Sequence, residues 1–238
     1  MKSSTISVGI FVFDDVELLD FAGPYEVFTK AAHLHEEDHP SAAPLFEVGT
    51  IAAARGHIRS RAGLHFSVDH DFSSHPAIDL PLVPGGRGTR EIAEPEVVTQ
   101  WIAAVAARSR ITASVCTGAF LLAEAGLLDG LSATTHWEDV GELGSRWPSV
   151  KVVEGVRWVD EGAIVTAAGV SAGADMSLHL VERLASRDLA LRTARLMEYD
   201  WVERAWRRPA GGALATAPRG PWSLSPRSSK STVGCTLG

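Results

Sequence analysis

The chain has 238 residues, of which 45% are hydrophobic and 21% are charged, an ordinary balance for one large globular domain. The formal net charge is -7. Because residues 207–238 hold five basic and no acidic residues, the rest of the chain holds 17 basic against 29 acidic ones. Such an acidic body is a poor duplex DNA binder, since phosphate neutralisation supplies most of that affinity. The apolar stretch at 6–13 is too short for a membrane span and lacks the cleavage pattern of a signal peptide. We therefore expect a cytoplasmic protein with no nucleic-acid or membrane partner.

Short β-branched or aromatic runs predict strands, and stretches with helical apolar spacing predict helices. In chain order, strands are expected at 6–13, 45–53, 78–83, 111–115 and 133–137. Helices are expected from Pro24 to about Ala32 and at 97–108, 118–129, 138–146, 171–186 and 189–199. Residues 33–43 are expected to form a loop, and residues 156–169 a hairpin that turns at Glu161-Gly162.

The alternation of strands with helices predicts one α/β domain with a mostly parallel sheet covered on both faces. This domain is expected to span residues 1–206. The segment 207–238 is basic and rich in Pro, Gly and Ser, which predicts a disordered tail.

The two cysteines, Cys116 and Cys235, lie far apart in the sequence, which argues against a structural disulfide. We therefore expect Cys116 to be a free thiol. Cys116 lies between a predicted strand and a predicted helix, a turn that pushes a side chain outward at the carboxyl end of a sheet. A helix N-terminus there is expected to lower the pKa of the thiol. A small buried core residue is the alternative interpretation.

Three other positions are candidates for chemistry. The glycine loop after residue 83, which contains Gly85 and Gly86, would open at the same sheet edge and bring backbone N–H groups to a ligand, or serve as an ordinary turn. Asp20 follows two leucines, so it is either a partly desolvated acid or a helix cap. His136 is either a base or a histidine that ends a strand.

Five motifs in order, covering about residues 6–200, resemble the ThiJ/PfpI branch of the class I glutamine amidotransferase-like fold. They are LLDFAGPYEVF, LPLVPGGRGTR, SVCTGAFLLAEAGLLDG, ATTHW and GVSAGADMSLHLV. The pattern is most similar to the isonitrile hydratase subgroup and to the sensor domains of certain transcriptional regulators. The resemblance implies a single-domain, flavodoxin-like three-layer sandwich with a cysteine nucleophile elbow. It also implies a homodimer.

Carried over by motif, the resemblance implies that Cys116 is the nucleophile, Asp20 its acidic partner and Thr117 an adjacent hydroxyl. It assigns oxyanion or substrate contacts to Gly85 and Gly86 and to His136. Protease-like members have a histidine directly after the cysteine, where this chain has Thr117, which argues against peptidase chemistry.

The implied function is a hydro-lyase that adds water to a small-molecule isonitrile, R–N≡C, to give an N-substituted formamide. Either the Cys116 thiolate attacks while protonated Asp20 donates a proton, or Asp20 activates water directly and Cys116 relays a proton. No metal or organic cofactor is implied, because no His, Cys and Asp cluster has ligand spacing. The alternatives are a non-catalytic small-molecule sensor domain and a glyoxal-directed hydratase or stress protein.

Overall fold

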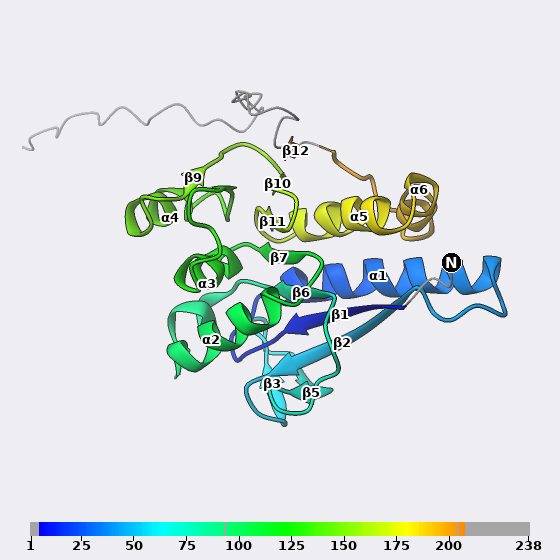
Figure 1. Ribbon diagram of the computed structural model, residues 1–238, viewed down its shortest axis with the longest axis horizontal. Helices are drawn as coiled ribbons and strands as arrows, with labels where there is room; N and C mark the ends of the chain where they lie inside the picture. The colour runs from blue at the N-terminus through cyan, green and yellow to red at the C-terminus, as the bar shows by residue number, and fades with distance from the viewer. Residues whose placement is uncertain (1–4, 93, 204, 208–238) are drawn as a thin grey trace, which may run out of the picture.

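The computed structural model describes residues 5–92, 94–203 and 205–207. A single eight-stranded sheet runs through it in the order β12-β10-β11-β7-β6-β1-β2-β5 (Figure 1). Two further pairs, β3 with β4 and β8 with β9, form separate two-stranded sheets. The strands of all three sheets are β1 (Ile6–Phe11), β2 (Phe46–Ala52), β3 (His57–Arg59), β4 (His65–Ser67), β5 (His70–Asp71), β6 (Leu80–Val83), β7 (Thr112–Val115), β8 (Ser132–Ala133), β9 (Lys151–Val152), β10 (Trp158–Asp160), β11 (Ile164–Ala167) and β12 (Ala205–Arg207). The helices are α1 (Leu18–Asp38), α2 (Pro95–Ala106), α3 (Gly118–Glu124), α4 (Val140–Arg146), α5 (Ala172–Leu184) and α6 (Arg187–Leu196), with a short 3-10 helix η1 (Arg87–Arg90).

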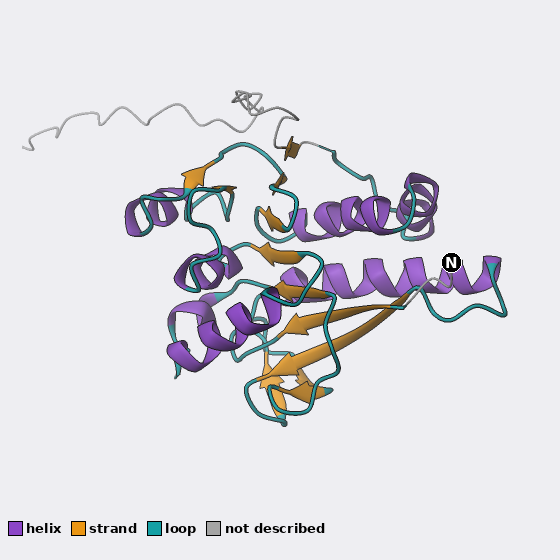
Figure 2. Cartoon of the chain, viewed as in Figure 1, coloured by secondary structure: helices purple, strands orange, loops and turns teal. Residues whose placement is uncertain are grey.

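Every pair in this sheet is parallel except β10 with β11, which form the predicted hairpin. The central strands β6 and β7 are buried at every position, as expected for parallel strands covered on both faces. Helices α1, α5 and α6 pack together on one side, and α2 and α3 pack on the other (Figures 1 and 2). The predicted α/β class with a mostly parallel, doubly covered sheet is therefore confirmed.

This topology gathers four loops at one edge of the sheet. The neighbouring strands β11, β7, β6 and β1 are parallel to one another, so their carboxyl ends meet at the same edge. The four loops that follow these strands contain Val170, Cys116, Gly85 and the approach to Asp20. This edge is where open α/β sheets bind ligands.

Helix α1 is longer than the sequence predicts at both ends. It begins at Leu18, so that Pro24 lies inside it, and it continues to Asp38 through six residues that we expected to be a loop. Pro24 and its neighbour Gly23 face the start of α5, where they lie beside Gly173 and Ala174. At the other end the extra turns bury Leu34 and bring Asp38 to within 2.6 Å of Arg192. Tertiary contacts thus override the local signals.

The strand expected at 133–137 is also shorter than predicted, because β8 ends at Ala133 and α4 begins only at Val140. His136 consequently lies in the loop between them. The expected tail begins at Arg207, the last residue of β12, and residues 208–238 with Cys235 lie outside the described residues.

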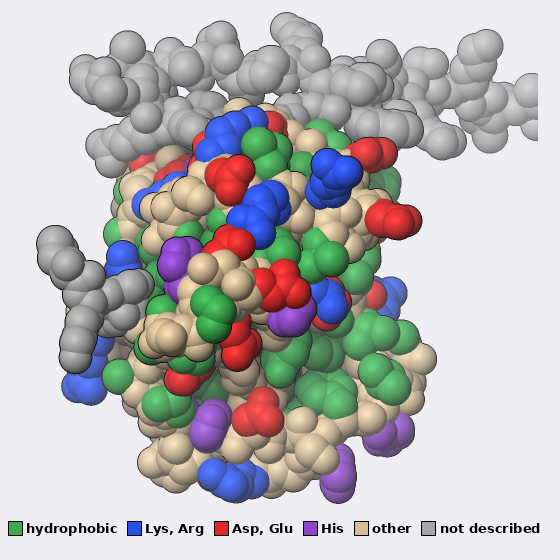
Figure 3. Space-filling model, turned by 90° about the vertical axis from the view of Figure 1, so that its right-hand side faces the viewer, with side chains coloured by type: hydrophobic (Ala, Val, Ile, Leu, Met, Phe, Trp, Pro, Cys, Tyr) green, Lys and Arg blue, Asp and Glu red, His purple; other side chains and the backbone are tan. Residues whose placement is uncertain are grey.

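No helix in the described part of the chain combines the length and apolar character that crossing a membrane requires. On the face shown in Figure 3, acidic and basic side chains are interspersed.

Candidate active site

Cys116 lies at the sharp turn between β7 and α3. Its φ angle of 56° is in the left-handed region, which is strained for a residue with a side chain and is characteristic of functional turns. The turn is possible because Gly118 lies against β6: a Cβ atom on Gly118 would lie 2.0 Å from the carbonyl oxygen of Val83. The predicted sharp strand-to-helix turn at Cys116 is therefore present, with the thiol largely buried (8% exposed).

Asp20, in the first turn of α1, faces Cys116 across the sheet edge. Its side chain is completely buried and forms a hydrogen bond with the Cys116 thiol. The Gly85 N–H donates to Asp20 Oδ2 at 3.1 Å, and the Val170 N–H donates to Asp20 Oδ1 at 3.0 Å. Both donors come from remote loops, so the carboxylate joins three loops rather than capping its own helix.

The environment of this pair makes ionisation of either group unfavourable. Burial raises the pKa of Asp20 from 3.8 to about 7, although the Val170 and Gly85 N–H groups oppose the shift; the nearby Glu17 carboxylate adds to it. Burial, and then the negative charge of Asp20, raise the pKa of the Cys116 thiol above its ordinary value. The prediction that a helix N-terminus lowers the thiol pKa is therefore wrong. Helix α3 has only seven residues, and its field does not offset desolvation.

It follows that the Cys116 thiol and the Asp20 carboxyl together hold two protons below about pH 7 and share one proton above it. Two acids in contact, both desolvated, lose their first proton as a pair and their second only at much higher pH. The thiol becomes nucleophilic when its proton moves to the Asp20 carboxylate. A proton that moves between these two atoms is what acid/base-assisted nucleophilic addition requires.

The glycine loop lies where the sequence predicted it, directly against the elbow. A Cβ on Gly85 would lie 2.6 Å from the Thr117 nitrogen and 2.7 Å from the Cys116 Cβ, so only glycine allows this approach. The amides, however, already have protein partners: Gly85 donates to Asp20, and Gly86 donates to Thr117 Oγ1 at 3.0 Å. Thr89 also donates to the Thr117 hydroxyl, at 3.1 Å. These groups hold the carboxyl and the loop in place, and an oxyanion role for the two amides stays a prediction.

His136 lies in the loop after β8, beside the turn that follows β11. Its ring packs on Gly169, where a Cβ would come within 2.2 Å of the ring. The Glu138 N–H donates weakly to His136 Nδ1 at 3.4 Å, and the Asp139 carboxylate lies 3.6 Å from the same nitrogen. His136 is therefore placed by its own loop and by contacts with neighbouring loops.

A pocket of about 400 Å³ opens over Cys116 and Thr117 and is also lined by His136 and Val170. Much of its remaining wall is charged, with contributions from Glu17, Arg61, Arg87, Arg90, Glu138 and Asp139.

Sequence reasoning missed Val170 and all six charged residues of the lining, of which Arg90 is the most connected. Arg90 forms ion pairs of 2.7 Å with Asp139 and with Glu142, which join η1 to the His136 loop and to α4. No local pattern indicates contacts across some 50 residues. Val170 had a usable signal, because it follows β11 as Cys116 follows β7.

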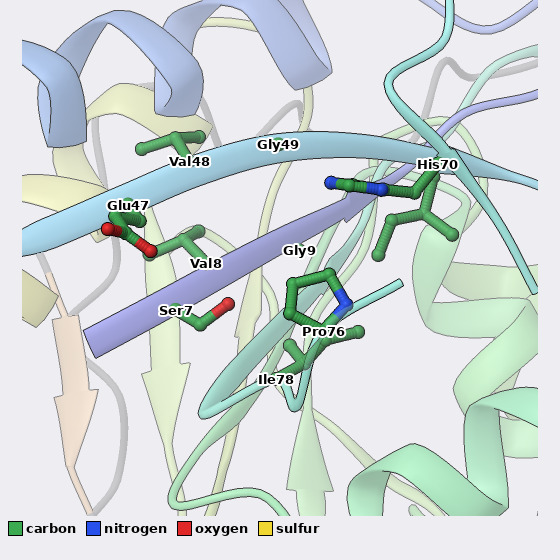
Figure 4. Close-up of a pocket in the computed structure, with 10 residues that line it drawn as sticks. Ser7, Val8, Gly9, Glu47, Val48, Gly49, His70, Pro76 and Ile78 are labelled. Atoms are coloured by element: carbon green, nitrogen blue, oxygen red, sulfur yellow. The ribbon is translucent and has the colours of Figure 1, made fainter. Parts of the chain in front are cut away.

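A smaller pocket, of about 220 Å³, lies elsewhere, where Gly9 of β1 and Gly49 of β2 are paired in register (Figure 4). It contains Glu47 and the ring of His70 but none of the predicted site residues. Within the described ranges, no group of three or more His, Cys, Asp or Glu side chains is arranged to hold a metal ion.

The protein is thus an α/β protein in which a buried thiol on a strained elbow is hydrogen-bonded to a buried carboxyl in the first turn of α1. The chain belongs to the DJ-1/PfpI family, which it matches over residues 6–183. It is 31% identical over 194 residues to the isonitrile hydratase of Pseudomonas putida, covering 82% of this chain and 78% of that protein. This agrees with the resemblance seen in the sequence motifs.

Two further relatives show how widely the domain is used. The HTH-type transcriptional regulator GbdR of Pseudomonas aeruginosa is 29% identical over 196 residues, covering 82% of this chain and 51% of the regulator. The chain thus spans about half the regulator's length. The crystal structure of a ThiJ/PfpI family protein from Pseudomonas syringae is similar, with a TM-score of 0.73 at 26% identity, covering 91% of this chain and 83% of that one.

Proposed function

We propose that this protein is a cysteine-dependent hydro-lyase that adds water to an isonitrile, R–N≡C, and releases an N-substituted formamide. The observation that carries the proposal is the buried, hydrogen-bonded Cys116–Asp20 pair, which can pass one proton back and forth at the floor of a pocket. The similarity to an isonitrile hydratase over most of both chains supports the choice of substrate class.

In the first step, Asp20 takes the thiol proton and the Cys116 sulfur attacks the terminal carbon of the isonitrile. Asp20 then donates that proton to the same carbon. The product of this step is a thioimidate, R–N=CH–S–Cys, in which sulfur and hydrogen have both been added to one carbon. An Asp20 pKa of about 7 suits this double role, because the group can then both accept and donate a proton at neutral pH.

In the second step, Asp20 is again a carboxylate and removes a proton from water, whose oxygen attacks the thioimidate carbon. Asp20 passes this proton to the nitrogen and is a carboxylate again, and the tetrahedral adduct R–NH–CH(OH)–S–Cys collapses. The carbon–sulfur bond breaks, the remaining hydroxyl proton returns through Asp20 to the thiolate, and R–NH–CHO leaves. Thr117 and the glycine loop hold the pair in place through both steps.

The test is formation of the formamide from simple alkyl and aryl isonitriles by the purified full chain, followed by NMR. Cys116→Ser should abolish turnover, and Asp20→Asn should reduce it by about a hundredfold or more, the scale of lost general acid/base catalysis. The mass of the intact protein after an acid quench distinguishes covalent attack by Cys116 from the alternative in which Asp20 activates water and Cys116 relays a proton. An adduct of substrate mass on Cys116 supports covalent attack, and its absence during turnover supports the proton relay. Failure to convert any isonitrile would overturn the proposed activity.

A sensor domain without turnover is the second candidate, supported by the similarity of the same region to a transcriptional regulator. A sensor would bind a small molecule in the Cys116 pocket and release it unchanged. Ligand-induced stabilisation against heat without any product would favour this function.

A further inference from the structure

The turn between β11 and α5 presents the Val170 N–H to Asp20, and it does so in a strained conformation. Val170 has a φ angle of 55°, in the left-handed region that a β-branched residue rarely adopts. Such a conformation persists only when the surrounding structure holds it. The contacts that hold this turn therefore decide whether the N–H reaches Asp20 Oδ1, 3.0 Å away.

Arg157, the residue before β10, holds the turn at both ends. Its carbonyl oxygen accepts a hydrogen bond of 2.8 Å from the Ala168 N–H, on the strand side of Val170. Its guanidinium Nη2 donates to Ser171 Oγ at 3.0 Å, on the helix side. One residue thus fixes both neighbours of the Gly169-Val170 pair.

The Arg157 guanidinium is in turn held by Asp175 of α5. Arg157 Nε donates to Asp175 Oδ2 at 2.5 Å, and Nη2 makes a second short contact with the same oxygen. Asp175 is completely buried, and its other oxygen accepts the Val202 N–H at 2.9 Å. The Tyr199 hydroxyl adds a hydrogen bond of 3.1 Å to the Ser171 carbonyl. Neither Arg157 nor Asp175 is among the residues that line the Cys116 pocket.

We propose that Arg157 and Asp175 are positioning residues that hold the Val170 amide against Asp20 and so tune the proton shared by Asp20 and Cys116. This assignment goes beyond the proposed reaction, since it concerns the state of the thiol with or without a substrate. An ion pair with a purely structural role would support the fold but leave the shared proton unchanged.

The direction of the effect follows from the hydrogen bond. The Val170 N–H stabilises the Asp20 carboxylate, so loosening the turn should make Asp20 hold its proton to higher pH. Two other carboxylates act on the pair, Glu17 on Asp20 and Asp139 on Cys116, and His136 packs on the turn from the β8 side.

The experiment measures the rate of Cys116 alkylation by iodoacetamide against pH in the full chain carrying Cys235→Ser. For a pair that shares one proton, the rate rises tenfold per pH unit up to the first ionisation and then levels off. The levelling-off should lie near pH 7 in the otherwise unaltered protein, where Asp20 ionises. In Ser171→Ala, which removes the Arg157 contact to the turn, the levelling-off should move up by roughly half to one unit. The plateau rate should rise in proportion, up to about tenfold.

Ser171→Thr keeps the hydroxyl and should restore the original profile. Ser177→Ala is the matched control: this buried serine of α5 donates to the Gly173 carbonyl at 2.8 Å and does not touch Arg157, so its loss should leave the profile in place. Asp175→Asn should shift the profile further than Ser171→Ala. If Asp175→Asn does not fold, Tyr199→Phe, which also frees Ser171, takes its place and should shift the profile in the same direction.

An unchanged levelling-off pH in Ser171→Ala and in the second variant would overturn the proposal, and so would an equal shift in Ser177→Ala. Because alkylation needs no substrate, this result is independent of whether the protein hydrates isonitriles.

Discussion

Replacing Asp20 with asparagine tests the central electrostatic argument through stability and not through activity. The pKa of Asp20 is 3.8 in the unfolded reference and about 7 in the folded protein. A carboxyl whose folded pKa is raised favours the folded state only while it is protonated. Its contribution is fully present below pH 3.8 and is lost as the pH rises to about 7. Asparagine does not ionise, so the variant escapes this loss.

The magnitude follows from the size of the shift. A rise from 3.8 to about 7 corresponds to about 4 kcal/mol of folding free energy that the wild type loses between pH 4 and pH 8. Asparagine also destabilises the variant by an amount that does not depend on pH. The substituted amide can accept from one of the Gly85 and Val170 N–H groups but turns its own NH₂ toward the other, which costs about 1–3 kcal/mol at every pH. The variant should therefore be less stable than the wild type at pH 4 and equal or more stable at pH 8.

Urea unfolding of both proteins at pH 4, 6 and 8 measures this difference directly. Asp38→Asn is the control with the opposite sign, because the hydrogen bond from Arg192 lowers the pKa of Asp38. Its relative stability should not improve as the pH rises. If the free-energy difference between Asp20→Asn and the wild type were the same at all three pH values, Asp20 would ionise in the fold as it does in the unfolded chain. The shared proton, and the mechanism built on it, would then be refuted.

Further outcomes can be measured on the same protein. The rate of Cys116 alkylation should level off above about pH 7 in the wild type. In Asp20→Asn the rate should keep rising tenfold per pH unit through that range. Rate profiles of the same shape in both proteins would show that Asp20 and Cys116 do not titrate together. Gly118→Ala should destabilise the protein severely, because the new Cβ would lie 2.0 Å from the Val83 carbonyl oxygen. The control is Gly141→Ala in α4, whose Cβ meets nothing within 4 Å, so this variant should be as stable as the wild type or more stable. Equal unfolding midpoints for the two variants would contradict the elbow geometry. Sedimentation should show a homodimer at micromolar concentration, and a monomer would remove that expectation.

Much of the site could be predicted from local patterns because parallel strands share a polarity. A strand-turn-helix run around Cys116, a glycine loop after β6 and an acid after β1 must all fall at the carboxyl edge of one sheet once the chain alternates strands with helices. Spacing alone therefore predicted the fold class, the elbow and the place of the glycine loop beside it, whereas the pairing of Asp20 with Cys116 was implied only by the family resemblance of the motifs. The ends of α1 were mispredicted, since Gly23 and Pro24 indicate a helix start until the packing of α5 against them is known.

The state of the thiol was decided by tertiary structure alone. The local pattern placed Cys116 at a helix N-terminus and so predicted a lowered pKa, but desolvation and the facing Asp20 carboxylate raise it. The donors that hold Asp20 lie 65 and 150 residues away, and neither the pairing of Arg157 with Asp175 nor its contact with the Val170 turn is visible in any motif. Local sequence specifies backbone conformation over a few residues, whereas burial and charge at a point are sums over all the segments that the fold brings there.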